Sequence, residues 1–391
     1  MSKVFVSAGD ASGEQHAAAL VETLRRRRPE LHFIGLGGPE MEKAGVEIVV
    51  HQHEIAVGGL VEVLGDVGRI VSAWRRLRKI LKARPDLVVL VDAPDFNIPL
   101  ARTASKAGIP VLYYVSPQVW AWRTGRIQKI ARRVDHMAVI FPFEVEVYSG
   151  TGLPVTFVGH PVVDRLRPFL EGRDAESCRS ALGLEGEAPC VALLPGSRRN
   201  EVRDTLPLQL DVVKAVHARD PRVRFAIGVA PSIPRETIDD RVREAALPSL
   251  IDLRVFEGRT REVIRAADVA LSKPGTVTVE IAVLGTPAVV AARAHPLTAF
   301  LMRRLVKVPS FTMPNLIAGE TVIPEFLQEE AQPGPIAEAL LARIAGPERD
   351  AQKRALAGVC ERLGRGGAAE RTADLVEEMM VVETTDGAAK A

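Results

Sequence analysis

The sequence contains few cysteines and no long apolar segment, and these absences exclude several classes of protein. Only three cysteines occur in 391 residues, and their spacing fits neither a metal site nor a disulfide framework: Cys178, Cys190 and Cys360. No run of about 18 apolar residues is present, so we expect no helix that spans a bilayer. The first expected strand begins near Lys3, which leaves no room for a signal peptide. We therefore expect a protein of the reducing cytoplasm.

The sequence also lacks a strong charge of either sign. Its formal net charge is +2 at pH 7, so the composition does not predict binding of nucleic acid. The chain of 391 residues exceeds the size at which a single hydrophobic core stops growing, about 250–300 residues, so we expect two domains. The histidines show no HxxxH or HExxH spacing, and the isolated pair His51 and His53 does not imply a metal site.

Apolar runs of strand length alternate with helical patterns along most of the chain, which predicts an α/β fold. A strand followed by a glycine-containing turn opens the chain, and the same pattern restarts near residue 190. We therefore predict two Rossmann-like domains that face a central cleft, followed by C-terminal helices. The expected boundaries are 1–165, 188–345 and 346–383, and the last segment is a candidate to pack back on the first domain.

Two carboxylates and an amide follow a buried strand that we expect at residues 87–91: Asp92, Asp95 and Asn97. Ligands of open α/β sheets bind beyond the carboxyl ends of the strands. Pro94 is expected to hold this segment in a turn rather than a helix. Asp92 is therefore our first candidate for a catalytic base and Asp95 the second. The alternative is that Asp92 or Asn97 only caps the next helix.

The first turn, residues 9–14, is acidic and lacks the GxGxxG fingerprint of dinucleotide-binding proteins. Asp10 and Glu14 offer acceptors for hydroxyl groups, which favours a polyol or a sugar over a phosphate at this turn. The alternative is that Asp10 or Ser12 simply caps the helix expected at residues 15–28.

Residues 60–81 show apolar residues at a spacing of three to four, which predicts one helix or a pair of helices broken near Gly65 or Gly68. The polar face of this segment is basic, and Trp74 lies among its apolar residues. A basic amphipathic helix can lie on an anionic membrane. The alternative is a helix that packs on the sheet and leaves its basic face in solvent.

Aromatic residues gather after the strand expected at residues 111–115. Trp120 and Trp122 follow this strand, with Arg123 beside them. Aromatic clusters after a strand often belong to the core, but Trp rings also stack on sugars and line acyl pockets. These three residues are therefore candidates to contact a sugar or a lipid.

Two turns in the second half have the features of anion sites. Gly196, Ser197 and Arg198 place a glycine, a hydroxyl and a guanidinium at the start of a helix, where backbone N–H groups and the helix dipole favour an anion. Gly275 and Thr276 form a second turn of this kind, again between a strand and a helix. Two such turns in one α/β domain suit a nucleotide diphosphate, and neither matches the GxxxxGK[ST] P-loop.

Three further polar residues are candidates to contact the nucleotide or its sugar. Glu280 lies about one helical turn beyond Thr276 and is placed to take two ribose hydroxyls. The alternative is that Thr276 is only an N-cap and Glu280 part of its helix surface. Asn315 and Gln328 follow apolar runs, in segments that read as loops.

These motifs together resemble those of the lipid-A-disaccharide synthase family, inverting glycosyltransferases of the two-domain GT-B type. The resemblance runs from about Val4 to at least Gln328, and its motifs are SAGDASGE (7–14), GLGGPEM (35–41), GLVEVLG (59–65), DAPDFN (92–97), YVSPQVWAWR (114–123), FVGHPVVD (157–164), LLPGSRRNEV (193–202) and MPNLIAG (313–319). It implies transfer of a diacylglucosamine unit from UDP-2,3-diacylglucosamine to 2,3-diacylglucosamine 1-phosphate (lipid X). This reaction forms a β-1′,6 link and releases UDP. The resemblance also implies a peripheral protein on the anionic cytoplasmic face of the inner membrane, with no metal and no cofactor.

Roles for the two halves follow from the resemblance. The first domain would bind the acceptor, with Asp92 as the base for its 6-hydroxyl and the 60–81 segment facing the membrane. The second domain would bind the UDP-sugar, with Arg198 and the N–H groups near Gly196 and Gly275 stabilising the departing UDP.

Two departures from the family pattern are visible. The first loop of the family usually has Glu then Asp, where this chain has Asp10 and Glu14. A later turn that usually reads SGT has Pro274 before Gly275, which removes one hydroxyl and one N–H. Two alternative functions are an isomerase similar to UDP-GlcNAc 2-epimerase and a non-catalytic UDP-sugar sensor. The basic amphipathic helix disfavours the first, and the DAPDFN motif disfavours the second.

Overall fold

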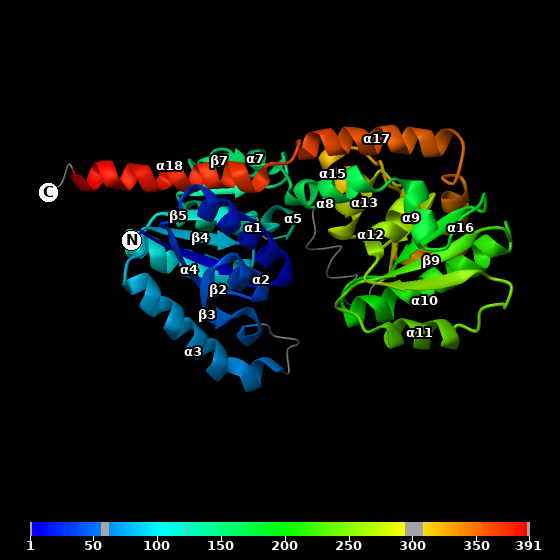
Figure 1. Ribbon diagram of the computed structural model, residues 1–391, viewed down its shortest axis with the longest axis horizontal. Helices are drawn as coiled ribbons and strands as arrows, with labels where there is room; N and C mark the ends of the chain where they lie inside the picture. Colours follow the sequence, from blue (N-terminus) through cyan, green and yellow to red (C-terminus); the bar gives the residue numbers. More distant parts are fainter. Residues whose placement is uncertain (1, 56–61, 123, 294–307, 389–391) are drawn as a thin grey trace. The chain divides into compact units, whose positions relative to one another are not determined.

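The chain divides into two compact units, each built around one parallel sheet (Figure 1). The computed structural model describes residues 2–55, 62–122, 124–293 and 308–388. Unit 1 comprises residues 1–161 together with 365–391, and unit 2 comprises residues 162–364. Strands and helices alternate in both units, which confirms the α/β class expected from the sequence.

Seven parallel strands form the sheet of unit 1, in the order β3-β2-β1-β4-β5-β6-β7. Their bounds are β1 Lys3–Ala8, β2 His32–Gly37, β3 Val46–His51, β4 Leu87–Val91, β5 Val111–Tyr114, β6 His136–Val139 and β7 Val155–Phe157. The order reverses between β1 and β4, so the topological switch point of this doubly wound sheet lies between these two strands. The edge strand β3 was not expected from the sequence.

Helices cover both faces of this sheet. Their bounds are α1 Ala11–Arg27, α2 Pro39–Ala44, α3 Glu62–Lys82, α4 Pro94–Lys106, α5 Val119–Trp122, α6 Ile127–Ala131, α7 Glu144–Val147 and α18 Ala368–Ala388, with short 3-10 turns η1 Gln52–Glu54 and η2 Thr124–Arg126. Helices α3 and α4 pack on one face through apolar side chains such as Leu77, Leu81 and Leu100. Helix α1 packs on the other face and lies beside α18.

The last helix is tied to the first by charge. Arg27 of α1 forms ion pairs with three carboxylates of α18: Glu370, Asp374 and Glu377. Arg371 of α18 donates from Nε to the Val158 carbonyl at 2.8 Å. Unit 1 is therefore completed by a segment that follows the whole of unit 2 in the sequence.

Six parallel strands form the sheet of unit 2, in the order β10-β9-β8-β11-β12-β13. Their bounds are β8 Cys190–Leu194, β9 Arg224–Val229, β10 Leu253–Glu257, β11 Val269–Ser272, β12 Ala288–Ala292 and β13 Glu325–Leu327. The strand order again reverses after the third strand in the order, which puts the switch point between β8 and β11.

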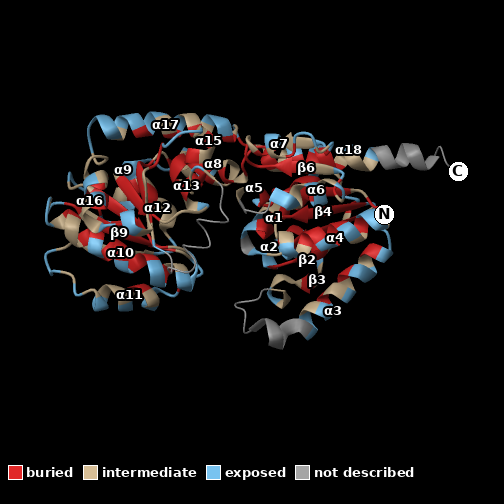
Figure 2. Ribbon diagram, turned by 180° about the vertical axis from the view of Figure 1, so that it is seen from behind, coloured by how far each residue is buried: buried red, intermediate tan, exposed pale blue. Residues whose placement is uncertain are grey.

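The helices of unit 2 also cover both faces of their sheet. Their bounds are α8 Pro161–Gly172, α9 Ala175–Ala181, α10 Arg199–His217, α11 Arg235–Glu244, α12 Thr260–Ala266, α13 Val277–Leu284, α15 Met313–Ala318, α16 Pro333–Leu341 and α17 Pro347–Leu363, with the 3-10 turn η3 Gln328–Glu330. Apolar residues of α10, α11 and α16 share a core with one face of the sheet. Figure 2 shows the buried residues concentrated in the strands and on the sides of the helices that face them.

Several sequence expectations about local structure are wrong. The first helix begins at Ala11 and not at residue 15, because Asp10 caps it. Pro94 opens α4 instead of holding a turn, since proline fits the first position of a helix. The region 168–188, expected to be helical only around residues 176–182, contains the end of α8 as well as α9. The segments around residues 315 and 328, expected to be loops, hold α15, β13 and η3.

The amphipathic segment is one helix over its described part, α3, with no break at Gly65 or Gly68. Within the described residues, no helix is both long and apolar enough to cross a membrane.

Candidate functional site

The candidate site of unit 1 lies at the carboxyl ends of β1 and β4, which are the strands that flank the switch point. Ala8 of β1 pairs with Val91 of β4, so the residues that follow these two strands emerge side by side. Asp10 follows β1 and Asp92 follows β4. The parallel pairing of β1 and β4 therefore brings these two carboxylates to one edge of the sheet, as expected for an open α/β sheet.

The backbone at Asp92 is held in an unusual conformation. Asp92 and Ala93 both have a φ of 45°, in a region of backbone conformation that residues other than glycine rarely adopt. The Asp92 carbonyl accepts hydrogen bonds from the Tyr113 hydroxyl at 2.6 Å and from Asn97 Nδ2 at 2.8 Å. Asn97 also bonds Ser7 and the Val91 carbonyl and is fully buried. Asn97 thus shapes the turn.

Glycine is required where the first loop meets this turn. A Cβ at Gly9 would lie 2.7 Å from the Cβ of Ala93, closer than two carbon atoms can approach. The left-handed backbone at Ala93 therefore fits against the first loop only because residue 9 has no side chain. The resulting close contact fixes the positions of Asp10 and Asp92.

The Asp92 carboxyl has a raised pKa. Burial, followed by the nearby Asp10 carboxylate, raises its pKa to about 6, against an opposing hydrogen bond from the Ala93 N–H. Both causes penalise the charged form of the acid. A carboxylate with a pKa near 6 is a better proton acceptor at neutral pH than an ordinary surface carboxylate.

The two acids of the first loop have different roles. Asp10 is exposed and caps α1, since its Oδ1 accepts from the Gly13 N–H at 2.7 Å and from the Ser12 hydroxyl at 3.0 Å. Glu14 is only 4% exposed, and its carboxylate accepts from the Glu40 N–H and from Gln52 Nε2. The expectation that Glu14 offers an acceptor to a sugar hydroxyl is therefore wrong, because this carboxylate caps α2.

Asp95 lies on the surface of the first turn of α4. Its side chain is 74% exposed and forms an ion pair with Arg126 at 2.7 Å. Asp95 is not among the groups that perturb the Asp92 pKa. Asp95 is thus exposed and ion-paired, whereas Asp92 is partly buried beside Asp10, so the geometry favours Asp92 over Asp95 as a base.

Sequence reasoning missed a buried acid at the same edge of the sheet, Glu144. Trp120 Nε1 donates to Glu144 Oε1 at 3.2 Å, and the Phe141 N–H donates to Glu144 Oε2 at 3.2 Å. Burial raises the pKa of Glu144 to about 8 in spite of these bonds, and the Asp92 charge adds to the rise. The Trp120 ring also packs edge-on against Phe143. Glu144 follows the end of β6, the strand next to β5 in the sheet, and this position in the sequence was the available signal for it.

The other proposed acceptor residues are placed differently. Trp74 of α3 packs against Phe96 of α4 at 5.3 Å between ring centroids, beside the core. Trp74, a candidate to contact lipid, is only partly buried, and one side of its ring covers the sheet. The side chain of Trp122 and the whole of Arg123 lie outside the described residues.

The candidate site of unit 2 lies at the carboxyl ends of β8 and β11. Leu194 of β8 pairs with Ser272 of β11, so the turn that holds Gly196, Ser197 and Arg198 emerges beside the turn that holds Gly275 and Thr276. The structure thus brings the two predicted anion turns together at the switch point of this sheet. Gln328 follows β13 at the same edge of the sheet, with a φ of 55°.

A carboxylate that the sequence analysis did not single out links these turns. Glu201 Oε2 accepts from the Ser197 N–H at 2.9 Å and from the Arg198 N–H at 3.3 Å. Its Oε1 lies 3.2 Å from Lys273 Nζ. A Cβ at Gly196 would lie 2.7 Å from the Cβ of Glu201, so glycine is needed there. Two N–H groups and an ammonium thus converge on one carboxylate at this edge of the sheet.

Two of the predicted side chains at these turns, Arg198 and Thr276, are exposed to solvent. The Arg198 side chain is 75% exposed and makes one ion pair, with Glu201. Thr276 is exposed, and its side chain makes no capping hydrogen bond to α13. Pro274 contributes no N–H, as expected from the sequence.

Two of the predicted donor contacts are engaged elsewhere. The buried Asn315 amide donates to Ser310, Glu325 and the Ile323 carbonyl and accepts from the N–H groups of Val322 and Ile323. Its expected contact with the nucleotide is therefore wrong, because the hydrogen bonds of this amide are already made inside the protein. Glu280 forms an ion pair with Arg165 of α8. Within the described parts of the chain, no three His, Cys, Asp or Glu side chains are grouped to hold a metal ion.

The sequence matches one family model over nearly its whole length. The model is described as lipid-A-disaccharide synthetase and matches residues 4–378. Lipid-A-disaccharide synthase of Geobacter sulfurreducens is 42% identical over 380 residues, which cover 97% of each chain. The synthase of Myxococcus xanthus is 40% identical over 380 residues, again with 97% of each chain covered.

The fold is that of GT-B glycosyltransferases. Acinetobacter baumannii MurG superposes with a TM-score of 0.61 at 16% identity and covers 97% of this chain and 100% of its own. UDP-GlcNAc 2-epimerase from Neisseria meningitidis, solved with UDP-GlcNAc, superposes with a TM-score of 0.64 at 13% identity over 97% of this chain and 100% of its own. At these identities the likeness shows the fold alone, and it does not distinguish a transferase from an epimerase.

Proposed function

The chain belongs to the lipid-A-disaccharide synthase family, and from this premise we propose which of its residues perform the transfer. The activity is that of a glycosyltransferase that condenses UDP-2,3-diacylglucosamine with lipid X and releases UDP. We assign the acceptor and the base to unit 1, and the UDP-sugar to unit 2. The assignment rests on the side chains at the two switch points. Carboxyl groups lie at that of unit 1, and the cationic groups of Arg198 and Lys273 lie at that of unit 2.

Asp92 is the proposed base. The acceptor 6-hydroxyl is a weak nucleophile and must lose its proton as it attacks the anomeric carbon of the donor. Asp92 supports this role because its backbone is fixed by Tyr113 and Asn97 while its carboxyl has a pKa of about 6. Asp10 acts on Asp92 by charge, and we assign it a positioning role with no direct part in the proton transfer.

Trp120 is the proposed sugar-stacking residue of the acceptor site. Its ring is held by Glu144 through the indole N–H and by Phe143 through an edge-on contact. A ring fixed at two points loses little conformational entropy when it stacks on a sugar. Burial keeps the Glu144 carboxyl protonated at neutral pH, because its pKa is about 8.

The diphosphate of UDP is proposed to bind at the paired turns of unit 2. Negative charge grows on the β-phosphate as the glycosidic bond to UDP breaks, and positive groups at this point stabilise it. The Arg198 guanidinium and the N–H groups near Gly196 and Gly275 are the proposed donors, with Lys273 close to both turns. The Ser197 and Arg198 N–H groups and Lys273 converge at this point on the Glu201 carboxylate, and a bound diphosphate must share these donors with it.

Thr276 and Gln328 are proposed as further donor contacts. Thr276 is exposed at the start of α13, and Gln328 follows the edge strand β13, which is separated from β11 by β12. Glu280 remains a candidate for the ribose, but its ion pair with Arg165 must then be shared with the sugar.

Contact with an anionic membrane is proposed for α3. The apolar side of this helix packs on the sheet through Ala73, Leu77 and Leu81, so the basic side faces outward. Arg75, Arg78, Lys79 and Lys82 are exposed on it. Such a basic surface is attracted to anionic lipids of a cytoplasmic leaflet, where the acylated substrates would be held.

One incubation separates the proposed reaction from its alternatives. The protein is mixed with UDP-2,3-diacylglucosamine, with and without lipid X, and the release of UDP is followed. We expect UDP release that depends on the acceptor, together with a disaccharide product. An isomerised donor would indicate an epimerase, and no turnover with retained UDP binding would indicate a sensor.

A further inference from the structure

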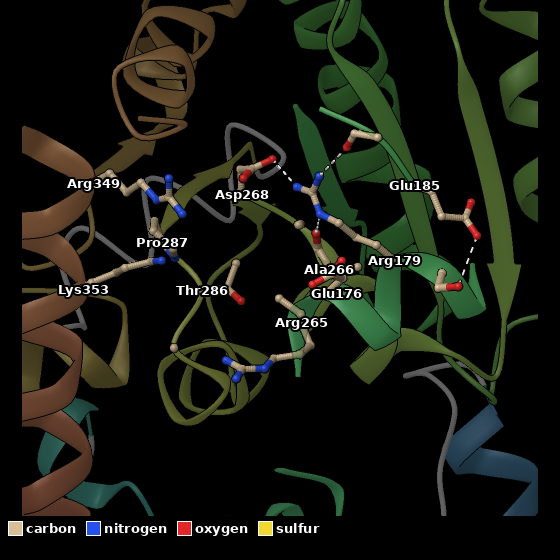
Figure 3. Close-up of a pocket in the computed structure, with 15 residues that line it drawn as sticks. Glu176, Arg179, Glu185, Arg265, Ala266, Asp268, Thr286, Pro287, Arg349 and Lys353 are labelled. Carbon is tan, nitrogen blue, oxygen red and sulfur yellow. Dashed lines mark hydrogen bonds and ion pairs between the residues drawn. The ribbon is translucent and has the colours of Figure 1, made fainter. Parts of the chain in front are cut away.

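A cavity of about 590 Å³ opens at the edge of the unit 2 sheet opposite the nucleotide turns (Figure 3). Asp268 and Pro287, which immediately precede β11 and β12, lie in its lining. The two anion turns follow the carboxyl ends of the strands, whereas this cavity lies at their amino ends. A ligand in the cavity would therefore not occupy the proposed UDP site.

One side of the cavity is neutralised by its own contacts. Arg179 NH2 forms an ion pair with Asp268 Oδ2 at 2.5 Å, and Arg179 Nε donates to the Ala266 carbonyl at 2.8 Å. The Cys190 N–H donates to the same Asp268 oxygen at 2.8 Å. The Asp268 carboxylate is therefore paired with the Arg179 guanidinium on this side of the cavity.

The other side carries cations without partners. Arg349 and Lys353 stand four residues apart on α17, so they project from the same face of this helix. Figure 3 shows both side chains reaching from α17 toward Pro287, with Arg179 and Asp268 across the cavity. Among the described residues, neither forms an ion pair or a hydrogen bond, and the Nε of Arg349 is buried with no acceptor.

A third cation completes the group. Arg265 lines the cavity and donates from NH1 to the Leu284 carbonyl, but its buried Nε also has no acceptor. The pKa of Lys353 is lowered, first by burial and then by the charge of Arg349, which outweigh the carboxylates nearby. The two remaining acids of the lining, Glu176 and Glu185, are exposed, and Glu185 accepts from the Ser180 hydroxyl.

We propose that this cavity is a second ligand site, which binds a small molecule bearing one or two phosphate groups between Arg265, Arg349 and Lys353. Its volume lies in the range of small-molecule pockets, about 300–1,000 Å³. Guanidinium groups donate in a planar fork that matches phosphate oxygens, and an ammonium adds a point charge. A phosphate supplies the acceptors that the two buried Nε groups lack.

The test is calorimetric titration of the full chain with inorganic pyrophosphate, with and without saturating UDP. Pyrophosphate also fits the paired turns proposed for the UDP diphosphate, so the event that we assign to the cavity is the one that persists when UDP is saturating. Lys353→Gln and Arg349→Gln should each weaken this event about tenfold, since each removes a charge-assisted contact. Arg354→Gln is the matched control: it removes the same charge from the next position of α17, which is exposed and outside the cavity lining.

Vesicles of phosphatidylglycerol distinguish a soluble phosphate from a lipid headgroup as the source of the ligand. Loss of pyrophosphate binding in both cavity variants, with Arg354→Gln unchanged, supports a soluble ligand. Loss of vesicle binding in the same two variants only, again with the control unchanged, supports a headgroup. The proposal is overturned if pyrophosphate and vesicle binding both survive in the cavity variants, if the control variant loses as much, or if UDP abolishes all pyrophosphate binding.

Discussion

The Asp10 carboxylate acts on the Asp92 carboxyl across the switch point of the first sheet and, after burial, is the main cause of its raised pKa. Asp10 is held by the α1 cap, and Asp92 by the hydrogen bonds to its own carbonyl. The two acids therefore keep a fixed separation in spite of their repulsion.

Asp92→Asn should lower kcat by roughly 10² or more, because an amide cannot accept the proton of the acceptor hydroxyl. Affinity for UDP should stay near that of the unchanged protein, since Asp92 lies in unit 1. Steady-state rates and calorimetry with UDP measure the two quantities. Turnover close to that of the unchanged protein would remove Asp92 from the role of base.

The pH dependence of kcat/KM should report the Asp92 pKa. A base works in its deprotonated form, so the rate should rise with pH through about 6. Asp10→Asn removes a negative neighbour and should shift this rise to lower pH. Asp95→Asn should leave the rise in place, because Asp95 is exposed and paired with Arg126. An equal shift in both variants would contradict the assignment.

Glu144 should make stability depend on pH. Its pKa is about 8 in the folded protein, above the value of about 4.3 expected when unfolded, so the folded state binds this proton more tightly. The contribution of this group to the free energy of unfolding is therefore highest below about pH 4.3 and falls as pH rises toward 8. Denaturant titrations at pH 5, 6.5 and 8 should show a smaller fall for Glu144→Gln. Parallel curves for the two proteins would refute this account.

Arg198→Ala should weaken UDP binding about tenfold or more, because a charge-assisted contact to the diphosphate is lost. Arg203→Ala provides the control, since Arg203 is an exposed arginine of the same helix that pairs with its neighbour Asp204. Calorimetry with UDP on the two variants gives the comparison. Equal affinities for UDP in both would place the diphosphate elsewhere.

Glu201→Ala should lower the free energy of unfolding by about 1–2 kcal/mol, because the Ser197 and Arg198 N–H groups lose their cap. The pKa of Glu201 is lowered by the Ser197 N–H and by Lys273, although burial opposes this. Its contribution is therefore present above the unfolded pKa of about 4.3 and is lost as pH falls through the lower folded value. Denaturant titrations at pH 7 and pH 3 should show the difference between the two proteins shrinking at the lower pH.

The positions of Asp92 and of the two anion turns could be predicted because they depend on local sequence and one topological rule. Each follows an apolar run of strand length, and parallel strands deliver their carboxyl ends to one edge. Residues buried by distant partners could not be predicted in this way. Asn315 reads as an open loop amide until Ser310, Ile323 and Glu325 are folded around it.

Local sequence also gave the wrong expectation where a residue stands in a position unusual for its type. Pro168 lies inside α8, where proline usually ends a helix, so this helix was not expected. Glu144 stands near the start of a short helix, where a carboxylate is ordinarily a cap. Its raised pKa comes from burial and from Asp92, which lies 52 positions earlier in the sequence. Neither cause is visible in the neighbouring residues.

The return of α18 to unit 1 has a consequence for how the protein is made. The whole of unit 2 is synthesised between residue 161 and residue 365, so a ribosome must finish it before the last helix of unit 1 exists. Unit 2 is one continuous stretch of the chain, so it is free to fold first. Until α18 is made, Arg26 and Arg27 of unit 1 cannot form their ion pairs with Glu370. Messages cut short within unit 2 would therefore yield an N-terminal product that lacks its closing helix, which is a substrate for the proteases that clear incomplete chains.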